Sequence, residues 1–393
     1  MMKKIRSLVA LAIAVLLGAA LLCGAALKAV YADSASANAG EKLAVSARSA
    51  LLVDYHTGTV VYEYNPTQHL PIASMVKIMT LGIIFDEIEK GGISFDTDVT
   101  ASANAGAMGG SQAFLDANAT YKAGELIKSI IVASANDSCV AMAEHIAGST
   151  EEFVTRMNDK AAALGMSDTH FVNCTGLPAP GAYSCARDVG TMTRELLRHD
   201  GFYQFSTVWM FDFVHPGGRF TSLSNTNKLL KGYEGCDGGK TGFTTEAMYC
   251  LSATAKRGQT RLISVVMGAA TSKERNAQNA KLFNYGFANY ETRRLVEKGA
   301  AVVDPVRVEK GKAEFVNVVP ADDLYYFGKK GKREVASEPT VQKLTAPVAM
   351  NQVAGELVVK VDGVEAGRVN LVAENDVKKK TYLDIVGDAI AGW

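Results

Sequence analysis

The chain has 393 residues, which is enough for a large core and for more than one domain. Lysine and arginine together number 41, as do aspartate and glutamate, so the formal net charge is zero. This balance argues against nucleic acid as the main partner, and a hydrophobic content of 48% argues against a disordered chain.

The first 32 residues are typical of a secretory signal peptide. A basic start precedes an apolar run over residues 8–27, and Val30-Tyr31-Ala32 provides a small residue for cleavage. The apolar run approaches the roughly 20 residues that cross a bilayer, so a retained single-span anchor is the alternative. Residues 33–46, rich in alanine, serine and asparagine, indicate a flexible leader. In either case we expect the fold to lie outside the cytoplasm.

Strand and helix signals begin at Ser49. Residues 49–54 and 59–64 are rich in valine, leucine and tyrosine around a His-Thr-Gly turn, and they predict a β-hairpin. Apolar residues then recur at helical spacing from Ser74 to Lys90. We therefore expect a helix with Ser74 at its start.

Two further helices are predicted at residues 125–133 and 138–146, separated by a polar break. A second hairpin is predicted from residues 248–255 and 262–267. Strands at both ends with helices between them indicate an α+β fold, with one mixed sheet and a helical insertion, over residues 47–296.

The pattern changes after residue 296. Short β-like runs with polar turns predict a small all-β domain over residues 297–376. In residues 377–393, three lysines precede apolar residues that fall on one face of a helix ending in Trp393. This pattern favours an amphipathic helix whose residues 378–393 lie on a membrane surface. The alternative is a final helix that packs on its own domain or frays.

Cysteine usage leaves the redox state open. Five cysteines follow the signal region, at positions 139, 174, 185, 236 and 250, and an odd number cannot all pair within the chain. Cys139 and Cys250 lie in apolar stretches and are predicted to be buried thiols. Cys174 and Cys185 lie in a segment rich in glycine and proline, which is compatible either with a disulfide or with free thiols. None of the spacings resembles a zinc site.

Three short motifs occur in a fixed order. Ser74-Met75-Val76-Lys77 comes first, Ser134-Ala135-Asn136 second and Lys240-Thr241-Gly242 third. Each is common by chance, but the ordered set is characteristic of serine enzymes that react with penicillin. Together they predict a serine nucleophile that is activated by a lysine.

Ser74 and Lys77 are three residues apart on the expected helix, so their side chains share a face. A serine hydroxyl needs a base within hydrogen-bond reach, and a lysine can serve if burial lowers its pKa. Taken alone, the pair is more typical of a capping serine and an exposed lysine. The apolar neighbours Met75, Val76 and Ile78 favour an enclosed Lys77.

The second motif lies at the break between two helices, where Asn136 or Asp137 can simply cap the second helix. The functional interpretation gives Ser134 a role as proton relay and gives Asn136 a hydrogen bond to the substrate backbone. Both interpretations can hold together, with Asp137 as the cap and Asn136 facing a cleft.

The third motif combines a cation, a hydroxyl and a glycine. Lys240 and Thr241 are suited to hold a terminal carboxylate, and Gly242 lets another backbone approach closely. As an isolated tripeptide the motif is typical of a turn, and the spacing of a phosphate-binding loop is absent.

The motifs resemble those of the low-molecular-mass penicillin-binding proteins, specifically the serine-type D-alanyl-D-alanine carboxypeptidases of the penicillin-binding protein 5/6 group (DacA-like, peptidase family S11). The resemblance extends over nearly the whole mature chain. Its segments are Ile72–Thr80, Ser134–Asp137, Ala143–Gly148, His170–Asn173, Ala186–Asp188, Asp237–Gly242 and Asn284–Phe287. It implies a β-lactamase/transpeptidase-like fold, followed by the all-β domain and the terminal amphipathic helix.

The resemblance also implies a substrate, the peptidoglycan stem peptide that ends in D-Ala-D-Ala. Ser74 would form an acyl-enzyme with Lys77 as general base, β-lactams would acylate the same serine, and no metal or cofactor is implied. The backbone N–H groups of Ser74 and Phe243 would form the oxyanion hole. Arg275 would bind the terminal carboxylate together with Thr241. Phe243 departs from the histidine that some members carry after this motif.

Other activities remain open at this stage. A serine β-lactamase or a D,D-endopeptidase shares the three motifs, and a wall-binding protein without activity could keep the fold. The E-x-x-L-N segment of class A lactamases is absent between Asn136 and Lys240. The intact serines and lysines argue against a protein without activity.

Overall fold

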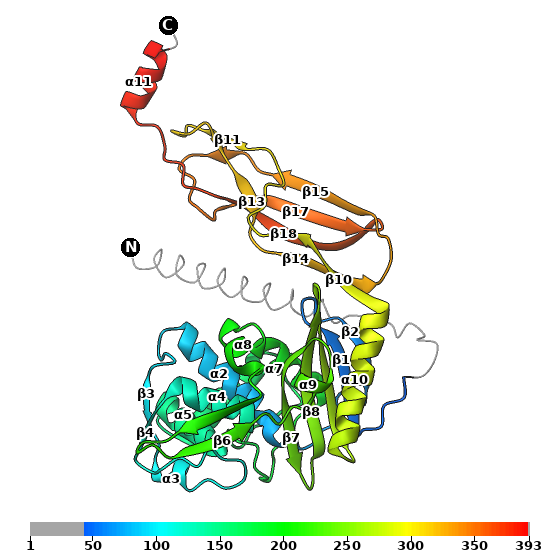
Figure 1. The fold of residues 1–393 in the computed structure, drawn as a ribbon. Helices are drawn as coiled ribbons and strands as arrows, with labels where there is room; N and C mark the ends of the chain where they lie inside the picture. The colour runs from blue at the N-terminus through cyan, green and yellow to red at the C-terminus, as the bar shows by residue number, and fades with distance from the viewer. Residues whose placement is uncertain (1–42, 392–393) are drawn as a thin grey trace, which may run out of the picture. The chain divides into compact units, whose positions relative to one another are not determined.

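The computed structural model describes residues 43–391. The predicted signal peptide, most of the predicted leader and Trp393 lie outside this range. The elements follow one another from blue to red in Figure 1, with a strand-rich segment at each end of a helical region.

A five-stranded sheet contains both predicted hairpins, and its strand order is β2-β1-β9-β8-β7. Its strands are β1 (Ser49–Asp54), β2 (Val60–Tyr64), β7 (Cys236–Thr244), β8 (Met248–Arg257) and β9 (Thr260–Ala269). All four neighbouring pairs are antiparallel. The α+β class is confirmed, but the expectation of a mixed sheet is wrong. Short turns join β7, β8 and β9, whereas a parallel pair needs a long crossover.

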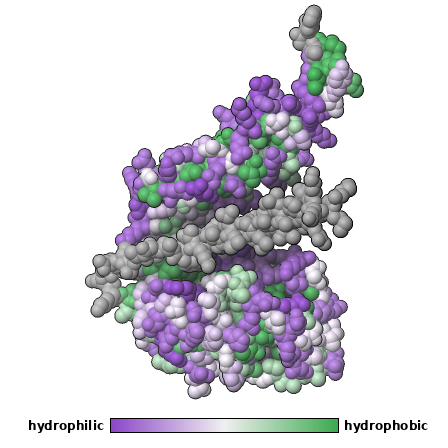
Figure 2. Space-filling view, turned by 180° about the vertical axis from the view of Figure 1, so that it is seen from behind, coloured by the Kyte–Doolittle hydropathy of each residue, from purple (hydrophilic) through white to green (hydrophobic). Residues whose placement is uncertain are grey.

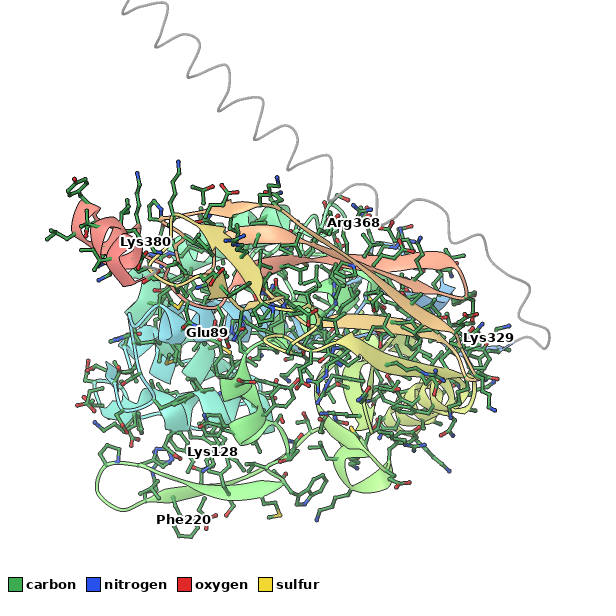
Figure 3. The ribbon with its side chains drawn as sticks, turned by 90° about the horizontal axis from the view of Figure 1, so that it is seen from above. Glu89, Lys128, Phe220, Lys329, Arg368 and Lys380 are labelled. Atoms are coloured by element: carbon green, nitrogen blue, oxygen red, sulfur yellow. The ribbon has the colours of Figure 1, made fainter. Side chains whose placement is uncertain are left out.

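The helical insertion lies between β2 and β7. It contains η1 (Ala73–Val76), α2 (Lys77–Glu89), α3 (Ala103–Gly106), α4 (Ala123–Ala133), α5 (Asn136–Ala147), α6 (Thr150–Ala163), α7 (Ala186–Leu196), α8 (Asp200–Ser206) and α9 (Leu229–Gly232). Two small hairpins, β3 (Asp98–Thr100) with β4 (Thr120–Lys122) and β5 (Met210–Val214) with β6 (Phe220–Ser224), complete it. Figure 3 labels Phe220 on the second hairpin and Lys128 on α4, whose ammonium lies 4.1 Å from the Phe211 ring centroid.

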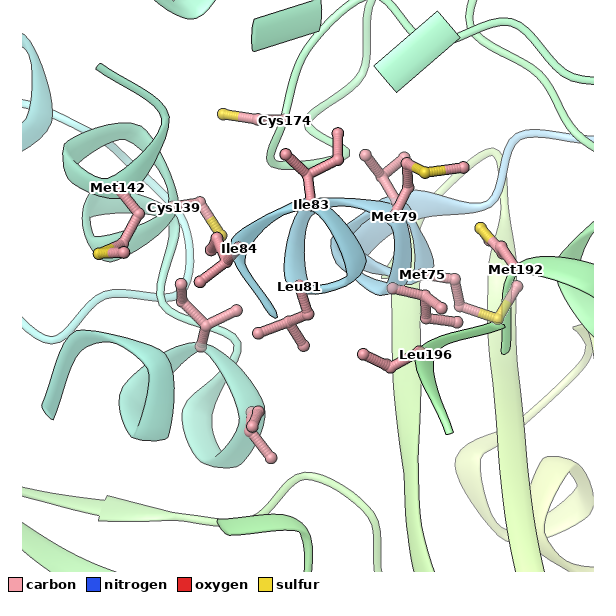
Figure 4. Packing of buried hydrophobic residues seen from close by; sticks show 14 of the residues in the cluster. Met75, Met79, Leu81, Ile83, Ile84, Cys139, Met142, Cys174, Met192 and Leu196 are labelled. Atoms are coloured by element: carbon pink, nitrogen blue, oxygen red, sulfur yellow. The ribbon is translucent and has the colours of Figure 1, made fainter. Parts of the chain in front are cut away.

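The first predicted helix is buried along most of its length. It begins as the 3-10 turn η1 and continues as α2, in which every residue from Lys77 to Phe85 is buried. Figure 4 shows its apolar side chains, among them Met79, Leu81 and Ile84, packed against the surrounding helices. The core therefore holds α2 on several sides and fixes the position of the residues at its N-terminal end.

The polar break between α4 and α5 is a sharp turn. Ser134 ends α4 with φ of 64°, in the left-handed region that non-glycine residues rarely adopt, and α5 begins two residues later. This conformation separates the axes of two otherwise apolar helices and leaves residues 134–136 at their junction.

The long helix α10 (Ser272–Asn289) packs on β8 and β9 and leads into the C-terminal strands. These are β10 (Tyr290–Val296), β11 (Val306–Glu309), β12 (Phe315–Val316), β13 (Val318–Pro320), β14 (Leu324–Lys329), β15 (Val335–Val341), β16 (Leu344–Thr345), β17 (Val353–Val361) and β18 (Val364–Ala373). They have a separate valine-rich core. The predicted all-β C-terminal domain is therefore present.

The last element, α11 (Tyr382–Ala391), is an exposed amphipathic helix. Tyr382, Leu383 and Ile390 are each more than 70% exposed, and Figure 2 shows this helix as a largely hydrophobic (green) segment at the top of the view. Among residues 43–391, no helix has both the length and the apolar character needed to span a bilayer.

All five cysteines after the signal region are free and buried. A disulfide between Cys174 and Cys185 is therefore not formed in this structure. Cys185 instead accepts a hydrogen bond from the Asp188 N–H at the start of α7, with an N–S distance of 3.4 Å. Figure 4 shows Cys174 and Cys139 packed near α2 from different segments.

Candidate functional site

The first motif brings a serine hydroxyl and a lysine amine together. The turn η1 presents Ser74 and α2 begins with Lys77, whose Nζ lies 3.1 Å from the Ser74 Oγ. Lys77 is fully buried, although a Ser-x-x-Lys pair taken in isolation favours an exposed lysine. The apolar neighbours noted in the sequence account for this burial.

Lys77 has two further partners, the Asn136 Oδ1 at 2.6 Å and the Thr175 carbonyl oxygen at 2.5 Å. Both of these oxygens can only accept hydrogen bonds. A neutral amine has two N–H groups and one lone pair, so donation to Asn136 and Thr175 leaves the lone pair for the Ser74 hydroxyl. Burial lowers the pKa of Lys77 and so favours this neutral form.

Thr175 belongs to a turn that none of the three sequence motifs includes. The Asn173 Oδ1 accepts hydrogen bonds from the Thr175 and Gly176 N–H groups, at 3.1 and 2.6 Å. A Cβ on Gly176 would lie 2.0 Å from the Ala73 carbonyl oxygen, so only glycine permits the contact with η1. The Asn-x-Thr-Gly pattern indicates a turn, but it does not reveal which lysine the turn contacts.

The second motif contributes Asn136, which bonds Lys77, and Ser134, whose buried hydroxyl makes no hydrogen bond within the described residues. Besides its contact with Lys77, Asn136 donates from Nδ2 to the Gly109 carbonyl at 2.7 Å. Ser134 is 3% exposed and its Oγ has no hydrogen-bond partner among the described residues. The structure therefore joins Asn136 to Lys77 but does not hydrogen-bond Ser134 to either.

Asp137 does not cap α5 in the way expected from the sequence. Its carboxylate accepts hydrogen bonds from the backbone N–H groups of Ala113, Phe114 and Leu115, at 3.0, 2.7 and 3.1 Å. It thereby holds the loop that also carries Gly109. Sequence spacing could not reveal this role, because the loop lies more than 20 residues away and contributes only backbone groups.

The third motif lies on β7, which is an edge strand of the sheet. Gly242 faces η1, where a Cβ would lie 2.5 Å from the Ile72 carbonyl oxygen. The Thr241 hydroxyl bonds the Thr226 hydroxyl at 2.7 Å. Phe243 is 54% exposed and its ring packs on Tyr249, with centroids 4.4 Å apart. An edge strand keeps a row of backbone groups available for another chain.

Two further cations are buried near this strand. Lys240 is 3% and Arg275 is 5% exposed, and burial lowers the pKa of each, with the Lys77 charge contributing to the effect at Lys240. Arg275 bonds Asn276 at 3.1 Å and Ser272 at 3.4 Å. Within residues 43–391, neither Lys240 nor Arg275 forms an ion pair with a carboxylate. Such a group of cations is suited to an anionic ligand.

A cavity of about 370 Å³ adjoins the 3-10 turn. Its walls are formed by Ile72 and Ala73, by the loop of residues 170–183 and by Thr244 and Glu246 beyond the third motif. The cavity thus runs from the Ser74 region past the end of β7. Its size and mixed polarity are suited to part of a peptide.

Comparisons with known proteins agree with this geometry. A family model for D-alanyl-D-alanine carboxypeptidase matches residues 34–271, and one for the C-terminal domain of penicillin-binding protein 5 matches residues 290–379. The chain is 40% identical to D-alanyl-D-alanine carboxypeptidase DacF of Bacillus subtilis, over 90% of this chain and 91% of that protein. It is 32% identical to DacA of Escherichia coli K12, over 88% and 87% of the two chains.

The fold agrees with solved structures as well. Penicillin-binding protein 5 of Haemophilus influenzae has a TM-score of 0.70 and 33% identity, and the match covers 87% of this chain and all of that one. The first family model alone matches more than half of the chain. The chain therefore belongs to the D-alanyl-D-alanine carboxypeptidases of peptidase family S11, and it is a serine-type enzyme of the penicillin-binding protein 5 type.

Proposed function

We propose that this carboxypeptidase removes the terminal D-Ala from peptidoglycan stem peptides through an acyl-enzyme on Ser74. The observation that carries the proposal is the buried Lys77 amine, 3.1 Å from the Ser74 Oγ and without an acidic partner among the described residues. Burial lowers the pKa of this amine, which favours the neutral form that can accept the Ser74 proton.

Lys77 acts as the general base in the first step. The Ser74 Oγ attacks the carbonyl carbon of the penultimate D-Ala while its proton moves to the Lys77 Nζ. The C–N bond then breaks, and the departing amine of the last D-Ala takes up a proton. Water hydrolyses the ester and restores the Ser74 hydroxyl.

Ser134 is the proposed proton relay to the departing amine. Its buried hydroxyl has no partner among the described residues, and an unsatisfied buried group of this kind costs about 1–3 kcal/mol. A strained backbone at φ of 64° holds it there. Substrate binding would supply the missing partner. Asn136, already fixed by Lys77 and Gly109, would hydrogen-bond the substrate backbone.

Lys240, Thr241 and Arg275 form the proposed site for the terminal carboxylate of the substrate. The two cations lack acidic partners in residues 43–391, so an incoming carboxylate would neutralise them. The peptide would extend along the free edge of β7 by strand addition, next to Gly242. The N–H groups of Ser74 and Phe243 are the proposed oxyanion hole, in which one donor contributes about 10²–10³ to kcat in other serine hydrolases.

The test compares the parent chain with Ser74→Ala. Both are incubated with a pentapeptide ending in D-Ala-D-Ala and with labelled penicillin. We expect D-Ala release and a slowly hydrolysed penicilloyl adduct from the parent and neither from the variant. Undiminished release by the variant would disprove the role of Ser74. Fast penicillin turnover without D-Ala release would instead identify a β-lactamase, and cleavage of cross-linked dimers alone would identify an endopeptidase.

We also propose secretion across the cytoplasmic membrane and peripheral attachment through residues 378–393. Exposed apolar side chains on α11, next to three lysines, support an interfacial helix. The proposed division is a signal peptide at 1–32, a leader at 33–46, a catalytic domain at 47–296, an all-β domain at 297–376 and the membrane helix at 377–393. Binding to anionic liposomes that persists after deletion of residues 378–393 would refute the attachment.

A further inference from the structure

A cluster of metal-binding side chains lies at the end of α2 opposite the catalytic lysine. Asp86 from α2, Glu195 from α7 and His199 at the start of α8 each offer a ligand atom, and these atoms all lie within 4.8 Å of one another. At 1.5 Å per residue along α2, Asp86 lies about 14 Å from Lys77. The cluster is therefore separate from the site described above.

His199 is oriented as histidine ligands of metals usually are. Its Nδ1 lies 2.6 Å from the Glu89 Oε1, and since a carboxylate only accepts, Nδ1 carries the proton in this bond. Figure 3 labels Glu89. A carboxylate that fixes one ring nitrogen and leaves the other for a metal is a common arrangement.

The other ring nitrogen of His199 has no hydrogen-bond partner among the described residues. The residue is 4% exposed, and its Nε2 faces the Asp86 Oδ1 at 3.5 Å, beyond a good hydrogen bond. A buried polar atom without a partner is destabilising. A ligand between His199 and Asp86 would satisfy it.

Lys160 is the competitor for this position. Its Nζ lies 2.5 Å from the Asp86 Oδ2 and 3.5 Å from the Glu195 Oε1, and its side chain is 15% exposed. The ammonium neutralises the two carboxylates but does not contact His199. Because the lysine side chain is long and reaches solvent, it can move away when a cation of higher charge binds.

We propose that Asp86, Glu195 and His199 bind a zinc ion that displaces the Lys160 ammonium. One imidazole nitrogen and two carboxylate oxygens form a three-ligand set that suits Zn²⁺ with water in the fourth position. Ligand atoms at about 2.0–2.2 Å from zinc lie closer together than 4.8 Å, so binding draws the three side chains inward by small rotations. The ion would join α2 to α7 and to the start of α8, and it would take no part in the acyl transfer.

Zinc uptake by the full chain tests the proposal. Chelator-treated protein is dialysed against ZnCl₂, and bound metal is measured for the parent, His199→Gln and the matched control His145→Gln, which alters an exposed histidine on α5. We expect the parent and His145→Gln each to bind one more zinc ion than His199→Gln. At the same site, the zinc affinity of His199→Gln should be at least tenfold lower than that of the parent. Equal uptake by all three would overturn the proposal.

Two further measurements keep the test decisive. Lys160→Met removes the competing ammonium and should tighten zinc binding, whereas unchanged or weaker binding would contradict the displacement. Co²⁺ in place of zinc should give visible bands without a thiolate charge-transfer band, which separates this site from binding by cysteines. Penicillin labelling checks that each variant is folded. If His199→Gln fails to label, Glu195→Gln takes its place with the same expected loss of zinc.

Discussion

At the scale of single residues, the proposed mechanism depends on the protonation state of Lys77. Its three partners fit a neutral amine, with Asn136 and Thr175 accepting its two N–H bonds and Ser74 facing its lone pair. Burial has the largest effect on the Lys77 pKa and lowers it, which favours the same neutral state, while the Asp137 carboxylate acts in the opposite direction.

The pH dependence of D-Ala release should report this ionisation. In the proposed mechanism Lys77 acts only when deprotonated, so kcat/KM should fall as the pH drops through the Lys77 pKa, which lies below the ordinary value near 10.4. Lys77→Arg keeps the charge but cannot lose its proton, and it should lower the rate by about 10²–10⁴ at every pH. A Lys77→Arg variant that kept the parent rate and still became faster with rising pH would contradict the role of Lys77 as general base.

Asp137 gives a second prediction at this scale. Asp137→Ala leaves the N–H groups of Ala113, Phe114 and Leu115 without their acceptor. Each buried donor without a partner costs about 1–3 kcal/mol, so the variant should lose at least about 3 kcal/mol of unfolding free energy. Asp137→Asn keeps one acceptor oxygen and should lose less. Urea unfolding of both variants measures this order, and equal stability of Asp137→Ala and the parent would refute it.

At the scale of elements, the site is assembled where η1 meets two other backbones. Gly176 lies against the Ala73 carbonyl on one side of the turn, and Gly242 of β7 lies against the Ile72 carbonyl. Neither position has room for a Cβ. Contacts between backbones thus fix the distance between the nucleophile, the Thr175 carbonyl and the edge strand.

Gly176→Ala and Gly181→Ala separate this close contact from backbone strain. Both glycines have positive φ, 79° and 84°, and both lie in the loop of residues 170–183, but a Cβ at Gly181 meets no atom within 4 Å. Gly181→Ala should lose only about 1–2 kcal/mol of unfolding free energy. Gly176→Ala adds a backbone clash and should lose about 2–5 kcal/mol of unfolding free energy. This variant should also no longer be acylated by penicillin. If the two substitutions had equal effects on thermal unfolding and on acylation, the close contact between Gly176 and Ala73 would be unimportant.

Both hairpins and the helices around the three motifs could be predicted because their signals are local. Ser74 and Lys77 were found for the same reason, as they are three residues apart along the chain. The antiparallel order of the sheet could not be predicted, since the pairing of β1 with β9 joins residues about 200 apart. Thr175 and Gly109 were missed because they act through backbone carbonyls, which no side-chain pattern encodes.

At the scale of the whole molecule, the five cysteines among residues 43–391 are free thiols, although the proposed secretion would place them in an oxidising compartment. Burial raises the pKa of Cys139, Cys236 and Cys250 to about 11 and that of Cys185 to about 12, and it raises the pKa of Cys174 as well. The reactive thiolate is therefore scarce at neutral pH, and the side chains are out of reach of reagents.

Brief alkylation of the native protein followed by mass spectrometry should leave these five thiols unmodified. Unfolding in denaturant should expose all five to the same reagent. Rapid modification of any of them in the native protein, or a Cys174–Cys185 peptide pair joined by a disulfide, would contradict the structure.

Both parts of the molecule, the Ser74-bearing α+β unit and the all-β domain, have counterparts in relatives that match this chain along most of their length. The central claim is that one serine, Ser74 in the turn η1, carries the acyl group. The most direct test is mass spectrometry of peptides from penicillin-treated protein. We predict a penicilloyl adduct on the peptide containing Ser74 and none in Ser74→Ala, whereas an adduct on another residue, or labelling that survives this substitution, would contradict the account.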